Sequence, residues 1–214
     1  MRNFLAVSLA LGALFTAGQA SADGTYGPEP SYNWGGVYGG ITAGYGATEQ
    51  DWRANGVKHD TDGVMLGGTL GVNMDTGRWV LGLEADYAWV DADDDSANGL
   101  CASPTTCTSE MKSFGTFRAR LGYDVGSAER GMLIYGTAGA AAIDVDYTVA
   151  TIGSDSELNL GWVAGAGLEM ALGEKLSAKI EYLHYDTQGS ATVGIPFSPE
   201  ATGDAARLGL NYRF

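Results

Sequence analysis

The fold class is decided by the stretch Trp79-Val80-Leu81-Gly82-Leu83-Glu84-Ala85-Asp86-Tyr87-Ala88-Trp89. Apolar or aromatic side chains stand at positions 79, 81, 83, 85, 87 and 89, and they alternate with the small or acidic residues Gly82, Glu84, Asp86 and Ala88. Because successive side chains of a β-strand point to opposite faces, this stretch predicts a strand with one apolar face and one polar or small face.

The same period of two residues recurs along the chain. It is clearest at 117–123, 158–169 and 207–214. We therefore expect an all-β chain with eight strands, at about 35–46, 63–74, 79–90, 111–124, 131–147, 157–171, 175–186 and 204–214.

The connections between these strands alternate in length. The long ones are 47–62, 91–110, 148–156 and 187–203, and the short ones are 75–78, 125–130 and 172–174. Short turns at one end and long loops at the other are typical of outer-membrane barrels. The sequence thus predicts an eight-stranded antiparallel transmembrane up-and-down β-barrel. A soluble lipocalin-like or sandwich fold is the alternative, but the aromatic residues at the ends of the apolar face favour a membrane-interface girdle.

The first 22 residues are organised as a secretory signal peptide. Arg2 supplies the positive start, an apolar run covers 4–17, and Ala20-Ser21-Ala22 forms a cleavage site. An uncleaved anchor is the alternative, but the run is shorter than the roughly 20 residues of a spanning helix. We expect 1–22 to be removed, 23–34 to form a periplasmic leader and 35–214 to form the barrel.

Charge and cysteine content narrow the possible partners. The formal net charge is −14, which argues against nucleic acid, because phosphates need basic patches. Cys101 and Cys107 are the only two cysteines and lie in one long connection. In an oxidising compartment such a pair predicts a disulfide, with two free thiols as the alternative.

If the apolar face points to lipid, the charged residues of the strands point into the lumen. The expected lumenal charge network consists of Glu84, Asp86, Arg118, Arg120, Glu169, Lys179, Glu181 and Arg207, and Asp144, Asp146 and Arg213 are also expected inside. Charges removed from water must be paired, and the interior of an eight-stranded barrel is only wide enough for side chains to fill it. We therefore expect a salt-bridge network that fills the barrel, with a conducting pore as the alternative.

Signals for catalysis are sparse, because the chain lacks the common hydrolase, zinc and nucleotide motifs. His59 and His184 are the only two histidines; they could offer an axial ligand to haem at the external rim, but they also fit ordinary surface residues. Asp186 and Ser190 lie near His184, which is an unspecific cluster for a hydrolytic site. We expect no enzyme and no cofactor.

A weak calcium signal lies in the second long connection. Asp91, Asp93 and Asp95 place carboxylates at alternate positions, as the start of a calcium loop does. Ser96 and Ala102 stand where an EF-hand needs glycine and glutamate. A solvated acidic loop is therefore the preferred interpretation, and no resident metal is expected.

The C-terminus and two internal motifs carry a family resemblance. A last strand ending in Tyr212-Arg213-Phe214 looks like the insertion signal that the barrel-assembly machinery reads, with Tyr212 and Phe214 as its aromatic residues. Three stretches together resemble the small outer-membrane β-barrels of alphaproteobacteria, the porin-family and surface-antigen group of brucellae and rhizobia: Trp34-Gly35-Gly36-Val37-Tyr38-Gly39-Gly40 with Ala43-Gly44-Tyr45-Gly46, Arg118-Ala119-Arg120-Leu121-Gly122-Tyr123, and Leu208-Gly209-Leu210-Asn211-Tyr212-Arg213-Phe214.

The resemblance implies a role in envelope integrity, or in host or surface contact through the external loops. Expected partners are outer-membrane lipid and lipopolysaccharide, the barrel-assembly machinery and a host or surface partner. Some relatives are described as porins or haemin binders, so a narrow porin-like channel or a receptor for haem or another small ligand is the alternative.

Overall fold

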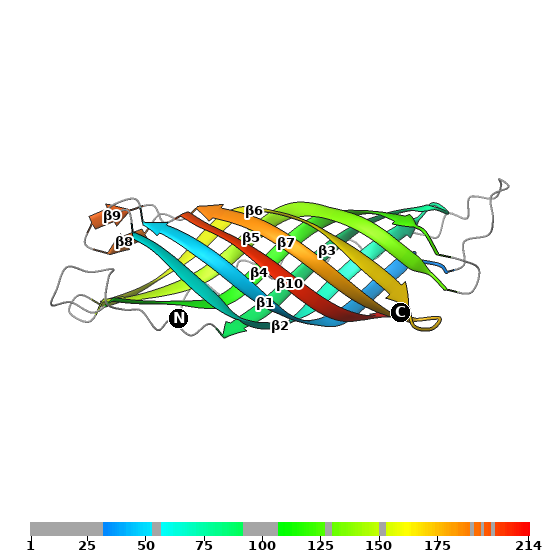
Figure 1. The fold of residues 1–214 in the computed structure, drawn as a ribbon, viewed down its shortest axis with the longest axis horizontal. Helices are drawn as coiled ribbons and strands as arrows, with labels where there is room; N and C mark the ends of the chain where they lie inside the picture. Colours follow the sequence, from blue (N-terminus) through cyan, green and yellow to red (C-terminus); the bar gives the residue numbers. More distant parts are fainter. Residues whose placement is uncertain are drawn as a thin grey trace.

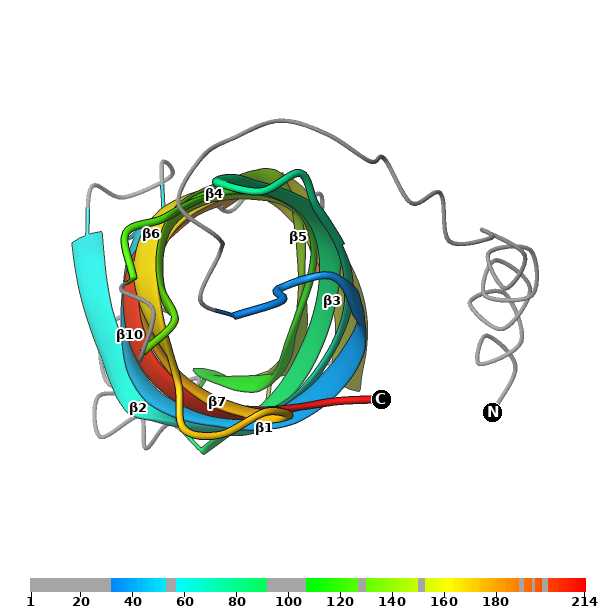
Figure 2. The same cartoon turned by 90° about the vertical axis from the view of Figure 1, so that its right-hand side faces the viewer.

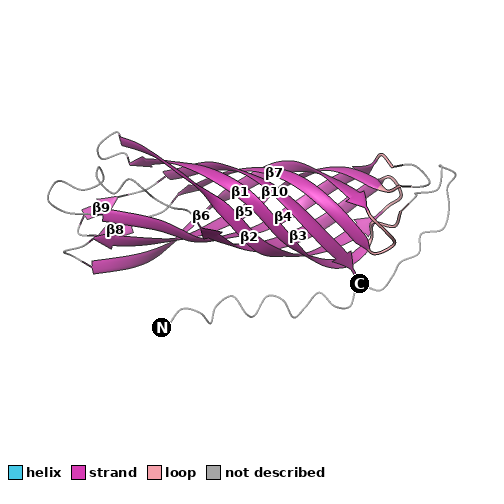
Figure 3. Ribbon diagram, turned by 60° about the horizontal axis from the view of Figure 1, so that its bottom comes forward, coloured by secondary structure: helices cyan, strands magenta, loops and turns pink. Residues whose placement is uncertain are grey.

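The computed structural model describes residues 32–52, 57–91, 107–126, 130–149, 153–188, 191–193, 195–197 and 200–214. Within these ranges the chain is built of strands and their connections (Figure 3). The strands are β1 Gly36–Trp52, β2 Val57–Asp75, β3 Trp79–Asp91, β4 Cys107–Asp124, β5 Met132–Val149, β6 Gly153–Ala171, β7 Leu176–Gln188, β8 Ala191–Val193, β9 Ile195–Phe197 and β10 Glu200–Arg213. No helix in the described ranges is long and apolar enough to cross a membrane.

Eight of the described strands close into one antiparallel barrel, in the order β1-β10-β7-β6-β5-β4-β3-β2 (Figures 1 and 2). Each of these eight strands pairs with the barrel strands that precede and follow it in the chain. β1 closes the ring by pairing with β10, where Ile41 lies opposite Leu210. The hairpin β8–β9 lies between β7 and β10 in the chain and pairs only within itself in the described residues. The predicted eight-stranded up-and-down barrel is confirmed.

The two faces of the wall have opposite chemistry. Outward side chains such as Ile41, Leu66 and Leu208 are about two-thirds exposed, whereas polar residues alternate with them and are buried inside. In water, exposure of so much apolar surface would be unfavourable. The pattern is that of a wall that faces lipid and keeps its polar groups in the lumen.

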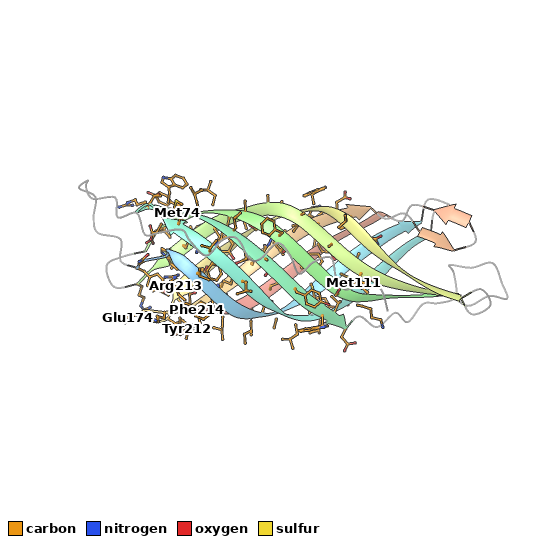
Figure 4. All side chains as sticks on the ribbon, turned by 180° about the vertical axis from the view of Figure 1, so that it is seen from behind. Met74, Met111, Glu174, Tyr212, Arg213 and Phe214 are labelled. Atoms are coloured by element: carbon orange, nitrogen blue, oxygen red, sulfur yellow. The ribbon has the colours of Figure 1, made fainter. Side chains whose placement is uncertain are left out.

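Short turns lie at one end of the barrel. Between β2 and β3, the Asp75 carboxylate accepts a hydrogen bond from the Gly77 backbone N–H at 2.8 Å, and Gly77 has a φ of +97° that favours glycine. Between β4 and β5, Asp124 accepts in the same way from Gly126. The C-terminus lies at this short-turn end (Figures 1 and 4).

At the opposite end the strands are longer than predicted. The expected loop 47–62 was wrong, since β1 reaches Trp52 and β2 begins at Val57. The expected loop 148–156 is likewise mostly strand, and 187–203 contains β8 and β9. The alternation of apolar and polar residues ends where neither face of a strand has to be apolar. The hydrogen-bonded pairing of the strands continues into this region, where both faces can contact water.

Candidate functional site

A layer of charged side chains fills the middle of the barrel. Each of its members is at most 7% exposed: Glu84 and Asp86 on β3, Arg118 and Arg120 on β4, Glu169 on β6, Lys179 and Glu181 on β7, and Arg207 on β10. These are four acids and four bases, so their formal charges cancel. The structure thus places all eight residues of the predicted network together inside the wall.

Arg118 is the centre of this layer. Its guanidinium lies 2.5 Å from Glu84, 2.6 Å from Asp86 and 3.0 Å from Glu181. Glu84 and Asp86 belong to the neighbouring strand β3, whereas Glu181 belongs to β7, which lies diametrically across the ring from β3. The ion pairs therefore bridge the lumen from wall to wall.

Arg120 forms the second junction. It pairs with Glu169, and its guanidinium carbon lies 3.7 Å from the centre of the Tyr135 ring, which is cation–π geometry. It also lies 3.9 Å from Glu84 and donates to the Tyr38 hydroxyl at 3.4 Å. One guanidinium thus connects β4 with β1, β3, β5 and β6.

Lys179 and Arg207 complete the cations of the layer. The Lys179 ammonium donates to Glu84 at 2.9 Å, and Arg207 donates to Glu181 and lies 3.5 Å from Asp86. Every acid of the layer contacts at least one of its bases. This pairing offsets part of the cost of removing the charges from water, although the buried Nε atoms of Arg118, Arg120 and Arg207 have no hydrogen-bond partner among the described residues.

Uncharged polar groups also donate hydrogen bonds to the carboxylates of the layer. Tyr38 donates to Glu84 at 2.7 Å, Thr116 to Asp86 at 2.9 Å and Ser177 to Glu169 at 2.5 Å. Tyr135, Asn211 and Thr69 donate to Glu181, Glu169 and Asp86. These six donors were not predicted from the sequence, because the expected network contained only charged residues and the aromatic residues were expected to face outward.

Three inward tyrosines lie against glycines on neighbouring strands. Tyr38 is paired with Gly71, Tyr135 with Gly167 and Tyr185 with Gly203. A Cβ built on any of these glycines would collide with the tyrosine ring. A tyrosine at a polar position of the alternation was therefore the sequence signal for an inward-facing ring. Glycine opposite an aromatic residue is a known pairing in sheets.

Apolar side chains fill the lumen on either side of the charged layer. Toward the long-strand end lies a cluster of Met65, Ala88, Phe114, Ala141, Ile143, Val163, Leu183, Tyr185 and Ala205, each at most 3% exposed. Toward the short-turn end, Trp34, Val80, Leu133 and Tyr135 form a second cluster. The described lumen is therefore packed in three layers, which is consistent with the narrow interior of an eight-stranded barrel.

The three other charged residues expected inside have different outcomes. The placement of Asp144 in the lumen was wrong, because the inward residue of this part of β5 is the buried Ile143, and Asp144 follows it on the outer face. Arg213 is buried inside, but near the short-turn end and apart from the central network. The side chain of Asp146 lies outside the described residues.

The weaker candidate sites do not assemble in the described residues. His59 is part of β2 and not of a loop, and its side chain is not among those described. His184 lies on the outer face of β7, where its Nδ1 is 2.8 Å from an oxygen of Asp204. Asp186 follows on that same outer face, and Ser190 lies outside the described residues.

The other predicted sites are only partly described. Asp91 ends β3 with an exposed side chain, whereas Asp93 and Asp95 lie outside the described residues. Cys107 begins β4, but Cys101 also lies outside, so the disulfide stays a prediction. Tyr212 and Phe214 are exposed on the outer face and pack edge to face, with ring centres 5.7 Å apart. Whether they act as an insertion signal also stays a prediction.

Comparisons with known proteins agree with this architecture. The 31 kDa outer-membrane immunogenic protein of Brucella melitensis biotype 1 is 29% identical over 247 residues, which cover 100% of both chains. The 22 kDa outer membrane protein of Rhizobium leguminosarum bv. viciae is 31% identical over 190 residues, covering 87% of this chain and 81% of that protein. The solid-state NMR structure of the outer membrane protein AlkL has a TM-score of 0.52 and 17% identity, covering 92% of this chain and 96% of AlkL.

The expected relationship to the brucella and rhizobium proteins is confirmed by these matches, and with it the location in the outer membrane. The short turns are therefore assigned to the periplasmic end and the long strands to the external end. A family model described as "Outer membrane protein beta-barrel domain" matches residues 6–214, and the chain belongs to this family of outer-membrane β-barrels.

Proposed function

We propose that this protein is a closed, non-enzymatic outer-membrane barrel that contributes to envelope structure and carries a surface for external contacts. The observation behind the proposal is the lumen: Arg118 joins β3 to β7 across the ring, and apolar clusters pack on both sides of this bridge. A filled interior supports a scaffold better than a channel. The proteins of Brucella that match the chain are named immunogenic, which fits a barrel with external parts exposed.

Conductance tests the closed barrel. The isolated protein is inserted into planar bilayers beside a variant with Arg118→Ala and Arg120→Ala. We expect silence from the unaltered chain. Steady conductance of the unaltered chain, changed in the variant, would make these arginines pore-lining and would put the porin-like alternative first.

The external contact surface is proposed to be the extension formed by β4, β5 and β6. Pairing of β3 with β4 ends at Trp89 and Ser113, but β4 and β5 stay paired out to Cys107 and Val149. β5 is paired with β4 on one side and with β6 on the other, so it offers no free edge in the described residues. Within the part of the chain that the structure describes, this extension has two edges, 107–112 of β4 beyond its last pairing with β3 and 153–159 of β6 beyond its last pairing with β7 at Leu160, and the β6 edge is the proposed contact surface.

An extended segment of a partner could add to that edge through backbone hydrogen bonds. The test deletes 146–157 and compares adhesion of cells carrying this variant with cells carrying a deletion of 191–197, which removes β8 and β9. Folded barrel is quantified in both by heat-modifiable migration in gels. Loss of adhesion only in the first variant supports the contact surface. Unchanged adhesion, with an increased sensitivity of the cells to detergent, would restrict the role to envelope structure.

Outer-membrane lipid and lipopolysaccharide would cover the apolar belt, and the barrel-assembly machinery would insert the chain after removal of residues 1–22. A haem or small-ligand receptor remains the alternative to test by titration of haem with the isolated protein. The contact of the His184 ring nitrogen Nδ1 with Asp204 leaves Nε2 as the atom that a haem iron would take, so the titration decides this alternative.

A further inference from the structure

The segment just before β1 crosses the periplasmic mouth of the barrel. Trp34 is fully buried and packs with Val80, Leu133 and Tyr135. These neighbours belong to β3 and β5, and β5 is diametrically across the ring from β1. Figure 2 shows the dark blue segment before β1 within the outline of the barrel ring. The chain therefore passes over the lumen before it enters the wall.

Polar contacts from two other strands hold this segment. The Trp34 backbone N–H donates to the Asp75 carboxylate at 2.9 Å, and the Asp75 residue ends β2. The Arg213 guanidinium on β10 donates to the Asn33 carbonyl and lies 4.7 Å from the Tyr32 ring centre. It also lies 5.6 Å from the Trp34 ring, within cation–π range. Figure 4 shows Arg213 among the labelled residues at the end that carries the C-terminus.

Glycines provide the room that the segment needs. A Cβ on Gly131 would lie 2.5 Å from the Tyr32 Cβ and 3.2 Å from the Trp34 ring. Gly36 has a φ of +112°, a conformation that favours glycine and turns the chain from the lumen into β1. Gly173, in another turn at the same end, has nothing within 4 Å of a built Cβ and offers a matched control.

We propose that Tyr32–Gly35 is a periplasmic lid, which closes the mouth of the barrel and can undock while the barrel itself stays intact. The hydrogen-bonded pairing of the wall begins at Gly36, so the lid is no part of the ladder. Its attachment depends on Asp75, Arg213 and the space at Gly131. Since Arg213 is the last residue of β10, the lid can dock only when β10 has closed the ring.

Thiol reactivity behind the lid tests this proposal. Val80→Cys is made in a Cys101→Ser, Cys107→Ser chain, and the protein extracted from outer membranes in detergent is treated with a water-soluble methanethiosulfonate. We expect slow reaction with the lid intact, and at least about tenfold faster reaction when Trp34→Ala or Gly131→Ala raises the population of the open state. Gly173→Ala should leave the reaction rate of the Val80→Cys thiol unchanged. A second probe, Ala88→Cys, lies in the apolar cluster toward the long-strand end, and its reaction rate should not change when Trp34→Ala or Gly131→Ala is added.

Three results would overturn the proposal. The first is a Val80→Cys thiol that reacts equally fast in all chains. The second is an acceleration by Gly173→Ala as large as that by Gly131→Ala. The third is faster reaction of the Ala88→Cys thiol in the lid variants, which would mean that the whole barrel opens. A measurement on the unaltered protein does not depend on the folding of any variant. Amide hydrogen exchange at Trp34 should be slow, and exchange at the rate of an unstructured peptide would exclude a docked lid.

Discussion

Arg118 and Glu84 stand directly opposite each other on β4 and β3, and their side chains meet inside the barrel at 2.5 Å. The wall itself therefore sets up this ion pair, because residues paired across two strands place their side chains on the same face. The guanidinium then reaches Glu181 on the far wall at 3.0 Å. A local pairing rule thus places a cation where it can join opposite sides of the lumen.

Arg118→Ala should be one of the most destabilising single substitutions in the barrel. It leaves Glu84, Asp86 and Glu181 with fewer cations in a site removed from water, and breaking a buried pair costs about 3–5 kcal/mol. Urea unfolding of the protein refolded into micelles measures the loss. Arg78→Ala is the control, since the side chain of this exposed arginine donates to Tyr123 at 3.3 Å and to no other residue that the structure describes. Equal losses for both variants would contradict the role of Arg118.

Arg120 and Glu169 should be energetically coupled. Glu169→Gln keeps an acceptor for Ser177 and Asn211, and Arg120→Met keeps an apolar stem beside Tyr135. We expect the double variant to lose less stability than the sum of the single variants, by about 0.5–3 kcal/mol. The same cycle between Arg120→Met and Asp204→Asn, on the outer face, should be additive. Additivity within the first pair would show that the contact contributes nothing.

Gly167→Ala should destabilise the barrel, whereas Gly136→Ala should not. A Cβ on Gly167 would lie 2.5 Å from the Tyr135 ring and 2.7 Å from the Ile180 carbonyl oxygen, while the nearest atom to one on Gly136 is 3.9 Å away. Overpacking of this kind costs about 1–3 kcal/mol. The midpoint of urea unfolding distinguishes the two. Recovery of stability in the Gly167→Ala, Tyr135→Leu double variant would locate the collision at the ring.

The sequence predicted the barrel and its charged layer for one physical reason. In a wall between lipid and lumen, the alternation of side chains separates apolar from charged residues, so Glu84 and Arg118 were assigned to the same interior. Tyr38 and Tyr135 were not assigned to the lumen, because an aromatic residue suits either face of the wall. Only its position in the alternation shows which face it occupies. The ion-pair partners across the ring depend on strand tilt and register, which the sequence alone does not provide.

The error at Asp144 has a different origin. The stretch from Gly136 to Ala142 on β5 consists mostly of alanine and glycine on both faces. It therefore has no apolar–polar alternation that would show which of the following residues face the lumen. A pairing irregularity on β4 between Met111 and Ser113 also falls beside this part of β5. The docking of the segment before β1 was not predicted, because residues 23–34 were expected to form a periplasmic leader and carry no alternation that would place Trp34 inside the barrel.

Cys101 and Cys107 should form a disulfide in protein taken from the cell envelope. A bridge over so short a loop is expected to add roughly 2 kcal/mol in the chain-entropy model. Denatured protein is treated with a maleimide polymer before and after reduction, and a gel shift only after reduction indicates the bridge. The Cys107→Ser variant should show one free thiol without reduction. A shift of the unaltered chain before reduction would show free thiols instead.

Phe214→Ala should lower the yield of assembled barrel in cells while leaving the folded protein nearly as stable. The Phe214 side chain is 73% exposed and packs with Tyr212, whereas its backbone N–H donates to Val37 at 3.1 Å whatever the side chain is. Its removal therefore takes little from the folded state, and a strong loss of assembly would reflect recognition of the ending. Phe117→Ala provides the control, because Phe117 is 59% exposed in the middle of the apolar belt. Heat-modifiable migration of membrane fractions measures assembly, and refolding into micelles measures stability. If the two variants assemble equally well, the C-terminal phenylalanine is no signal and serves only as part of the lipid-facing surface.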